Sequence, residues 1–285
     1  MPIYEQAYRK YEAREGLRSV RFWPITREAL RLLFARKAFL ALSIVAWIPA
    51  LGFILYVFGV SKVAEANPDV TRIAPLDGRI FLWLYFAQTL AAFVVTTFST
   101  AGLVAGDRRS GAMVMYLARP LTPRDYMIGK LAVPLLINLA LTLGPGLLVY
   151  GVALAIAPDR LRASGFVSLA PGVVVYAIVI AIVTSVLGVG LSAMTKSARV
   201  AGLSFFAVAM GLEPVAAIAR ALSDSPRAGL ISLRACLEAV GSTLLAVRVE
   251  STSPRPLEAS LVLLLVVLAC LFAFRSRVRA VEIVT

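Results

Sequence analysis

The sequence contains no histidine, and this absence removes several kinds of chemistry at once. Histidine is the commonest metal ligand among side chains and the usual carrier of protons near neutral pH. The chain therefore has no His-ligated metal site, no His general base and no His proton relay. The two cysteines, Cys236 and Cys270, have no CxxC spacing, so neither a disulfide nor a metal site is indicated.

Charged residues are also scarce, because Asp, Glu, Lys and Arg make up 16% of the 285 residues while 60% are hydrophobic. Soluble domains carry about 25% charged residues, so this composition is typical of a membrane protein. Four uncharged runs each exceed the approximately 20 residues that a spanning helix needs. They cover residues 38–61, 80–106, 131–158 and 163–195. Two weaker runs cover residues 200–212, extendable through 219, and 259–274.

These runs predict an all-α polytopic membrane protein with a six-helix transmembrane domain in residues 38–274. Five spans is the alternative if the fifth run is re-entrant. Residues 213–256, between the last two runs, carry mixed charges, and we expect two short outer helices there. The first covers 214–222 and the second covers 228–246, each lying on or dipping into the outer leaflet. Arg234 and Glu238 form an i, i+4 pair suited to one helix face.

The net charge of +13 would suggest a nucleic-acid partner in a soluble protein. Its distribution favours a different interpretation. With six spans and both termini inside, the inner segments hold 19 Lys/Arg against seven acids, whereas the outer segments hold ten against nine. Lys and Arg concentrate in cytoplasmic loops of membrane proteins. We therefore expect an inner-membrane protein with cytoplasmic tails at 1–37 and 275–285, and no nucleic-acid partner.

The segment before the first run predicts an amphipathic interfacial helix. Thr26 can cap a helix that starts at Arg27. Leu30, Leu33 and Phe34 then form one apolar stripe with Ala29, while Arg27, Arg31 and Arg36 lie off it. Such a helix lies on the cytoplasmic leaflet and contacts membrane lipid. It serves either as a topology anchor alone or as an anchor that also contacts a partner protein.

The loop between the second and third runs, residues 105–130, carries Arg108, Arg109, Arg119, Arg124 and Lys130 against Asp107 and Asp125. Between these charges lies a short apolar segment, 112–118, bounded by Gly111 and Arg119-Pro120, which predicts a two-turn helix. An apolar helix exposed to the cytoplasm indicates a docking surface. Gly129-Lys130 is not part of a P-loop, because position 124 is arginine and position 131 is leucine.

The motifs of this loop resemble the first cytoplasmic loop of type-2 ATP-binding-cassette exporter permeases. The resemblance rests on Asp107, Gly111-Ala112, the apolar run, Arg119-Pro120-Leu121-Thr122, Tyr126 and Gly129-Lys130. It implies a coupling helix that sits in a cleft of a separate ATPase subunit, with contacts from Asp107, Arg108, Gly111, Ala112, Leu117, Arg119 and Pro120. It also implies that ATP and Mg²⁺ bind the partner rather than this chain, and that a second permease copy or a paralogue completes the transporter.

Three polar residues in or beside the apolar runs are candidates for a substrate pathway: Gln88, Asn138 and Glu213. Gln88 and Asn138 are more often interhelical hydrogen-bond partners than substrate ligands. Glu213 either lies within the outer part of the bilayer or marks the end of the fifth span. Two other functions stay open at this point. One is an ion-coupled secondary transporter, which would need ionisable groups near the midplane, and the other is a non-transporting membrane platform that uses the same architecture. An enzyme is not indicated, because no nucleophile–base or metal cluster is visible.

Overall fold

The computed structural model describes residues 21–67, 76–112, 121–156, 166–223, 225–248 and 254–282, and the regular structure within these ranges is helical. Six helical stretches are long and apolar enough to cross a membrane, which confirms the predicted six and fits a multi-pass membrane protein. They are Lys37–Ala66, Gly78–Ser110, Pro123–Ile156, Phe166–Met194, Ala198–Ser223 and Pro256–Val278.

The first of these stretches consists of two helices, α2 (Lys37–Val45) and α3 (Ile48–Ala66). The break falls at Ala46-Trp47, just before Pro49. Proline has no N–H and fits the first turn of a helix better than its interior, so a new helix begins here.

The helix that precedes this stretch, α1 (Trp23–Phe34), starts earlier than the sequence predicts. Pro24 occupies its first turn, and Thr26 lies inside the helix rather than at its cap. The Thr26 hydroxyl instead donates a hydrogen bond of 2.9 Å to the carbonyl of Gly129 in the third stretch. The prediction of a Thr26 cap was therefore wrong, because the hydroxyl makes a tertiary contact.

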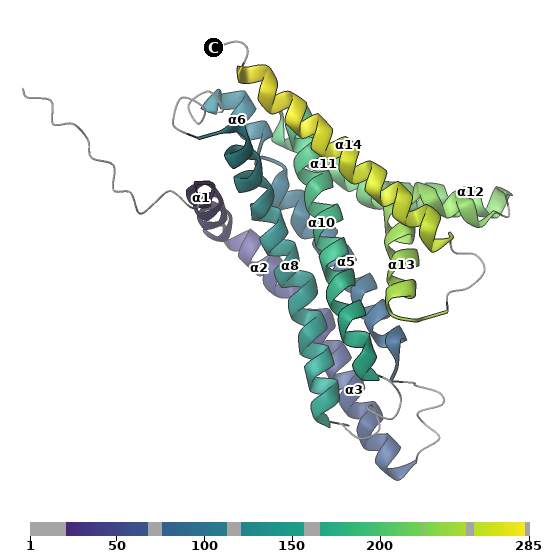
Figure 1. Ribbon diagram of the computed structural model, residues 1–285. Helices are drawn as coiled ribbons and strands as arrows, with labels where there is room; N and C mark the ends of the chain where they lie inside the picture. The colour runs from purple at the N-terminus through teal and green to yellow at the C-terminus, as the bar shows by residue number, and fades with distance from the viewer. Residues whose placement is uncertain are drawn as a thin grey trace, which may run out of the picture.

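The centre of the bundle consists of α5 (Gly78–Thr100), α8 (Pro123–Ile156) and α10 (Ala170–Met194), and a 3₁₀ helix, Phe166–Leu169, leads into α10. Of the 18 most apolar consecutive residues in the stretch that contains α10, 72% are buried, against 17% in the first and last stretches. Figure 1 shows α8 and α10 running the length of the bundle, with α3 extending beyond them at one end.

Glycines on α10 bring its neighbours close. A Cβ on Gly188 would meet the side chains of Thr96 and Thr100 on α5. A Cβ on Gly190 would meet the Cβ of Cys270 at 2.7 Å on α14 (Pro256–Glu282). Side chains at these positions would push the helices apart, so the small residues set the packing distance, as is usual between membrane helices.

The fifth stretch bends. It begins as α11 (Ala198–Phe206), passes through a π-helical turn (Ala207–Gly211) and continues as α12 (Leu212–Ser223). Figure 1 shows α12 directed sideways, away from the long axis of the bundle. A π-helical turn inserts a residue into the helical ladder, and such turns commonly mark bends.

Both short helices predicted within residues 213–256 are present with altered bounds, although the first is the end of the fifth stretch rather than a separate helix. The first is α12. The second divides at Ser232 into a 3₁₀ helix, Pro226–Ile231, and α13 (Leu233–Leu244). Ser232 is the reason for the division, because its hydroxyl accepts the N–H of Ala235 at 3.1 Å and so caps α13. The chain then returns through α14, whose C-terminal end lies near α6 (Ala105–Ser110) in Figure 1.

Candidate functional site

The loop that the sequence singles out begins with the short helix α6, which follows α5 after one turn. The N–H groups of Val104 and Ala105 each donate to the Ser192 hydroxyl at 3.2 Å. Because the first N–H groups of a helix have no partner within it, this hydroxyl from α10 fixes the start of α6. The helix ends at Gly111, whose φ of 70° is left-handed and favours glycine.

Asp107 of α6 makes a buried ion pair with α8. Its Oδ2 lies 2.7 Å from Lys130 Nζ and accepts a 2.8 Å hydrogen bond from the Tyr126 hydroxyl. The Lys130 side chain is 6% exposed and that of Asp107 is 17% exposed, so the pair is largely screened from solvent. The Tyr126 ring is fully buried and lies 6.4 Å from the Phe274 ring of α14. One carboxylate thus connects α6 to α8, and Tyr126 extends the contact to α14.

Arg108, the next residue, points to the end of α10. Its guanidinium donates to the Ala193 carbonyl at 2.5 Å and to the Thr195 carbonyl at 3.3 Å. The last carbonyls of a helix have no intrahelical partner, and a cation there interacts favourably with the helix dipole. Arg108 therefore caps α10 while it holds α6 beside that helix.

The start of α8 has its own capping arrangement. The Thr122 N–H and hydroxyl donate to Asp125 Oδ2 at 3.0 and 2.8 Å, and the Asp125 N–H donates back to the Thr122 hydroxyl at 3.2 Å. Pro123 occupies the first helical position. This is a capping box with proline at the position where its missing N–H costs least. The helix start is therefore determined by local residues.

The residues predicted to contact a partner fall into three groups. Asp107 and Arg108 are engaged inside the chain, as described above, whereas Gly111 is exposed and Ala112 is half-buried. Leu117, Arg119 and Pro120 lie outside the described residues, as does most of the predicted helix 112–118. Sequence reasoning missed α6, because its six residues, AGDRRS, carry no apolar periodicity.

Asn138 of α8 is fully buried at the centre of the bundle. Its amide nitrogen lies 2.9 to 3.1 Å from the hydroxyl oxygens of Thr96 on α5 and of Thr184 and Ser185 on α10. The Thr96 hydroxyl also reaches the Asn138 amide oxygen at 3.0 Å. This neutral network, which we call the Asn138 network, joins three helices in the way polar residues do inside membranes.

Gln88 of α5 is also fully buried, and it hydrogen-bonds to backbone carbonyls that lie beside proline-containing breaks and kinks in the helices. Its amide nitrogen, in the orientation that satisfies both contacts, lies 3.0 Å from the carbonyls of Ala46 and Leu141. Leu141 precedes Pro145 by four residues, and proline has no N–H for that carbonyl. Ala46 lies at the break between α2 and α3. Gln88 thus supplies a donor where the backbone lacks one.

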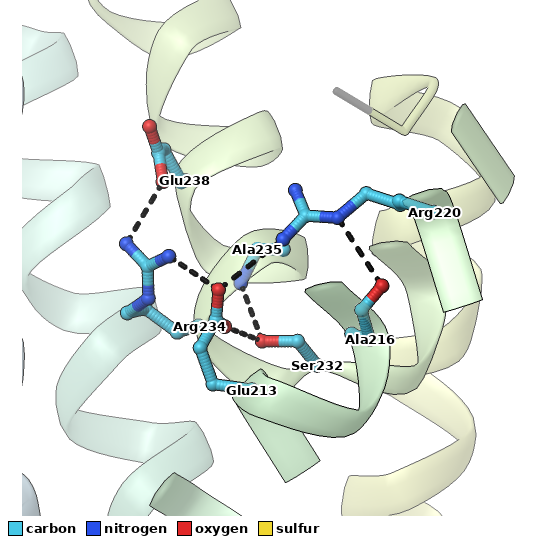
Figure 2. A network of polar contacts seen from close by, with 7 residues as sticks. All are labelled: Glu213, Ala216, Arg220, Ser232, Arg234, Ala235 and Glu238. Atoms are coloured by element: carbon cyan, nitrogen blue, oxygen red, sulfur yellow. Dashed lines mark hydrogen bonds and ion pairs between the residues drawn. The ribbon is translucent and has the colours of Figure 1, made fainter. Parts of the chain in front are cut away.

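Glu213 anchors a charged network between α12 and α13, shown in Figure 2 and called the Glu213 network below. Glu213 Oε1 lies 2.5 Å from Arg234 and 3.4 Å from Arg220. Its other oxygen accepts from the hydroxyl of Ser232. Arg234 also reaches Glu238 at 3.3 Å and stacks 4.8 Å from the Phe86 ring of α5. The expected Arg234–Glu238 pair is present, whereas the link to Glu213 spans 21 residues and was not predicted.

No family model matches the chain, and no curated protein matches it. Among the described residues, no group of three or more His, Cys, Asp or Glu could hold a metal ion. The function is therefore inferred from the residues themselves and from the junction between α6, α8 and α10.

Proposed function

We propose that the chain is the membrane-spanning permease subunit of an ATP-binding-cassette exporter. In this role it couples ATP hydrolysis by a separate ATPase subunit to the efflux of a substrate across the inner membrane. Two copies, or this chain and a paralogue, enclose the substrate path. The observation that carries the proposal is the anchored junction at the loop: α6 and the start of α8 are fixed on either side of residues 113–120 by Asp107, Arg108 and the Thr122 capping box.

The placement of the basic segments supports a cytoplasmic position for this junction. Figure 1 places α1, α6 and the C-terminal end of α14 at the same end of the bundle. This end carries Arg108, Arg109, Arg275 and Arg277, and Lys/Arg-rich ends of membrane proteins face the cytoplasm. A loop held there can be reached by a cytoplasmic ATPase. Rigid attachment matters, because displacement of the loop moves the spanning helices only if α6 and the start of α8 keep their positions relative to those helices.

The helix α1 fits an interfacial position in the same arrangement. Ile25, Thr26 and Leu33 are buried, and the Thr26 hydroxyl bonds to α8. Trp23 and Phe34 are exposed, and aromatic side chains such as these are favoured at the interface between lipid headgroups and acyl chains. Of the predicted stripe, Leu33 therefore packs inward, Leu30 is half-buried and Phe34 is left for lipid.

The Glu213 network is the observation that weighs against an ion-coupled transporter. A coupling-ion site needs a carboxylate that can bind and release its ion. Glu213 is engaged by two guanidinium groups and a serine hydroxyl, so a coupling cation would have to displace these contacts. We therefore assign Glu213 to helix positioning and place ATP hydrolysis, on the partner, as the energy source.

The proposal is tested by co-expressing the chain with P-loop ATPases from the same genome and measuring co-purification from detergent. Leu117→Asp places a charge on the predicted docking helix, and we expect the affinity for the ATPase to fall at least about tenfold, as for a central interface residue. Asn67→Asp, which adds the same charge near the opposite end of the bundle, is the matched control and leaves the affinity unchanged. Equal binding by both variants would refute the docking role, and so would failure of the wild-type chain to bind any P-loop protein.

A further inference from the structure

One turn of α8, from Tyr126 to Lys130, contacts three other elements at once. Gly129 accepts the Thr26 hydroxyl of α1, and a Cβ on Gly129 would meet Ile25 at 3.1 Å. Lys130 and Tyr126 hold Asp107 of α6. Tyr126 also contacts Phe274 of α14. Whatever moves α6 therefore acts on α8 at the turn where α1 and α14 are attached.

Asp107 is poorly placed to contact a partner protein directly. Its carboxylate is engaged by an ammonium and a phenol from the same chain, and its side chain is 17% exposed. Arg109 and Ser110, two and three residues later, are exposed. The docking role that the resemblance implies for Asp107 therefore does not account for its contacts.

We infer that Asp107 and Lys130 are positioning residues. They transmit movement of residues 113–120, here called the docking loop, to α8, α1 and α14. This inference rests on the proposed function. Buried ion pairs add little net stability relative to apolar packing, yet they fix a unique arrangement in some proteins. The ion pair joins α6 to α8, the two helices that precede and follow residues 113–120 in the sequence. It keeps the two ends of the loop at a fixed separation, so that displacement of the loop shifts the helices instead of stretching the loop.

The inference is tested by measuring the separation of the loop ends. Spin labels are placed at Ser110→Cys on α6 and Arg124→Cys on α8, both exposed positions, in a Cys236→Ala/Cys270→Ala background. When Asp107 and Lys130 are both intact, double electron–electron resonance on the labelled protein in vesicles should give one narrow distribution of distances between the two labels. Asp107→Asn and Lys130→Met should each widen it at least about twofold. The reversed pair, Asp107→Lys with Lys130→Asp, should restore the wild-type width.

Two readouts separate positioning from mere folding. Association with the partner ATPase should stay within about twofold of wild type in Asp107→Asn. The change in the Ser110–Arg124 distance on adding ATP and vanadate to the complex should be lost. Lys62→Met, which removes the exposed pair with Glu65 at the opposite end, is the matched control and should change neither readout.

The outcomes distinguish this inference from the proposed function. Unchanged widths in both single variants would overturn the positioning role and leave the proposed function intact. A widened distribution in a chain that binds no ATPase would refute the proposed function and the transmission step, while the role of the ion pair in joining α6 to α8 would stand. If the single variants aggregate, the reversed pair decides: a folded protein of wild-type width supports the inference, and a broad or aggregated one overturns it.

Discussion

The Asn138 network and the Glu213 network both connect helices inside a largely apolar chain, yet they differ in charge and exposure. The Asn138 network is neutral, and each of its side chains is fully buried. The Glu213 network contains two acids and two arginines, and these four charged side chains are 21–36% exposed. The first joins α5, α8 and α10 at the centre, whereas the second joins α12 and α13 at the side.

The difference follows from the cost of burying charge. An amide and three hydroxyls can satisfy one another without any ionised group, so they tolerate the centre of the bundle. A carboxylate and a guanidinium lose far more hydration, and their attraction offsets the loss only with close geometry and partial exposure. The bundle therefore connects its central helices with neutral groups and keeps its ion pairs at the side or the ends.

The largest expected effect comes from placing a charge in the neutral network. Asn138→Asp keeps the shape of the side chain but introduces a carboxylate at a fully buried position. We expect the free energy of unfolding to fall by about 3–5 kcal/mol at pH 7, the cost of a buried charge without a partner. Unfolding in mixed micelles with increasing SDS, followed by circular dichroism, measures the change.

The matched control is Asn138→Leu, which removes the amide without adding charge. It should cost about 1–2 kcal/mol, because the hydroxyls lose one partner but can still bond to backbone carbonyls. Thr184 already donates to the Ile180 carbonyl at 2.7 Å. If the aspartate variant proved as stable as the leucine variant, the argument that charge is excluded from this position would fail.

A smaller effect is expected in the charged network. Glu213→Gln and Arg234→Gln should each lower the free energy of unfolding by about 1–2 kcal/mol, because the 2.5 Å contact is charge-assisted but partly exposed. The double variant should cost less than the sum of the two single variants, since both remove the same contact.

The control for this pair is Arg227→Gln. Arg227 is 71% exposed and lies 3.4 Å from Glu258, so the change should stay within about 0.5 kcal/mol. Strict additivity of Glu213→Gln and Arg234→Gln would contradict a direct interaction between the two side chains. The same SDS titration serves all four variants: Glu213→Gln, Arg234→Gln, their double variant and Arg227→Gln.

The number of spanning helices could be predicted because its signal is local. A run of about 20 uncharged residues is visible without any knowledge of its neighbours. The bend in the fifth stretch was not visible, since residues 207–211 are as apolar as their surroundings and only the structure assigns them a π-helical turn. The prediction that Thr26 caps a helix failed for a related reason: a local pattern cannot reveal that Gly129, 103 residues later, accepts its hydroxyl.

The candidate site was located by sequence, but its internal contacts were not. The charges of residues 105–130 and the breakers Gly111 and Pro120 identify a loop. That Asp107 pairs with Lys130 depends on how α6 turns back against α8, which no spacing rule gives. A usable signal did exist, because Lys130 directly precedes the uncharged run 131–158, and a lysine at the edge of a buried helix commonly has an acidic partner.

The last prediction concerns α13, which carries Arg234 on a partly exposed face and the fully buried Cys236 on the opposite one. Burial raises the pKa of the Cys236 thiol to about 11. Alkylation requires the thiolate, so at pH 8 the reaction with iodoacetamide should be roughly 100-fold slower than for a thiol of ordinary pKa. Mass spectrometry of the Cys270→Ala protein measures the rate, and the same protein unfolded in SDS is the control. That substitution keeps the Cβ that packs against Gly190. A folded protein that reacts as fast as the unfolded one would mean that α13 does not pack tightly on its buried side, and the contrast between its two faces would disappear.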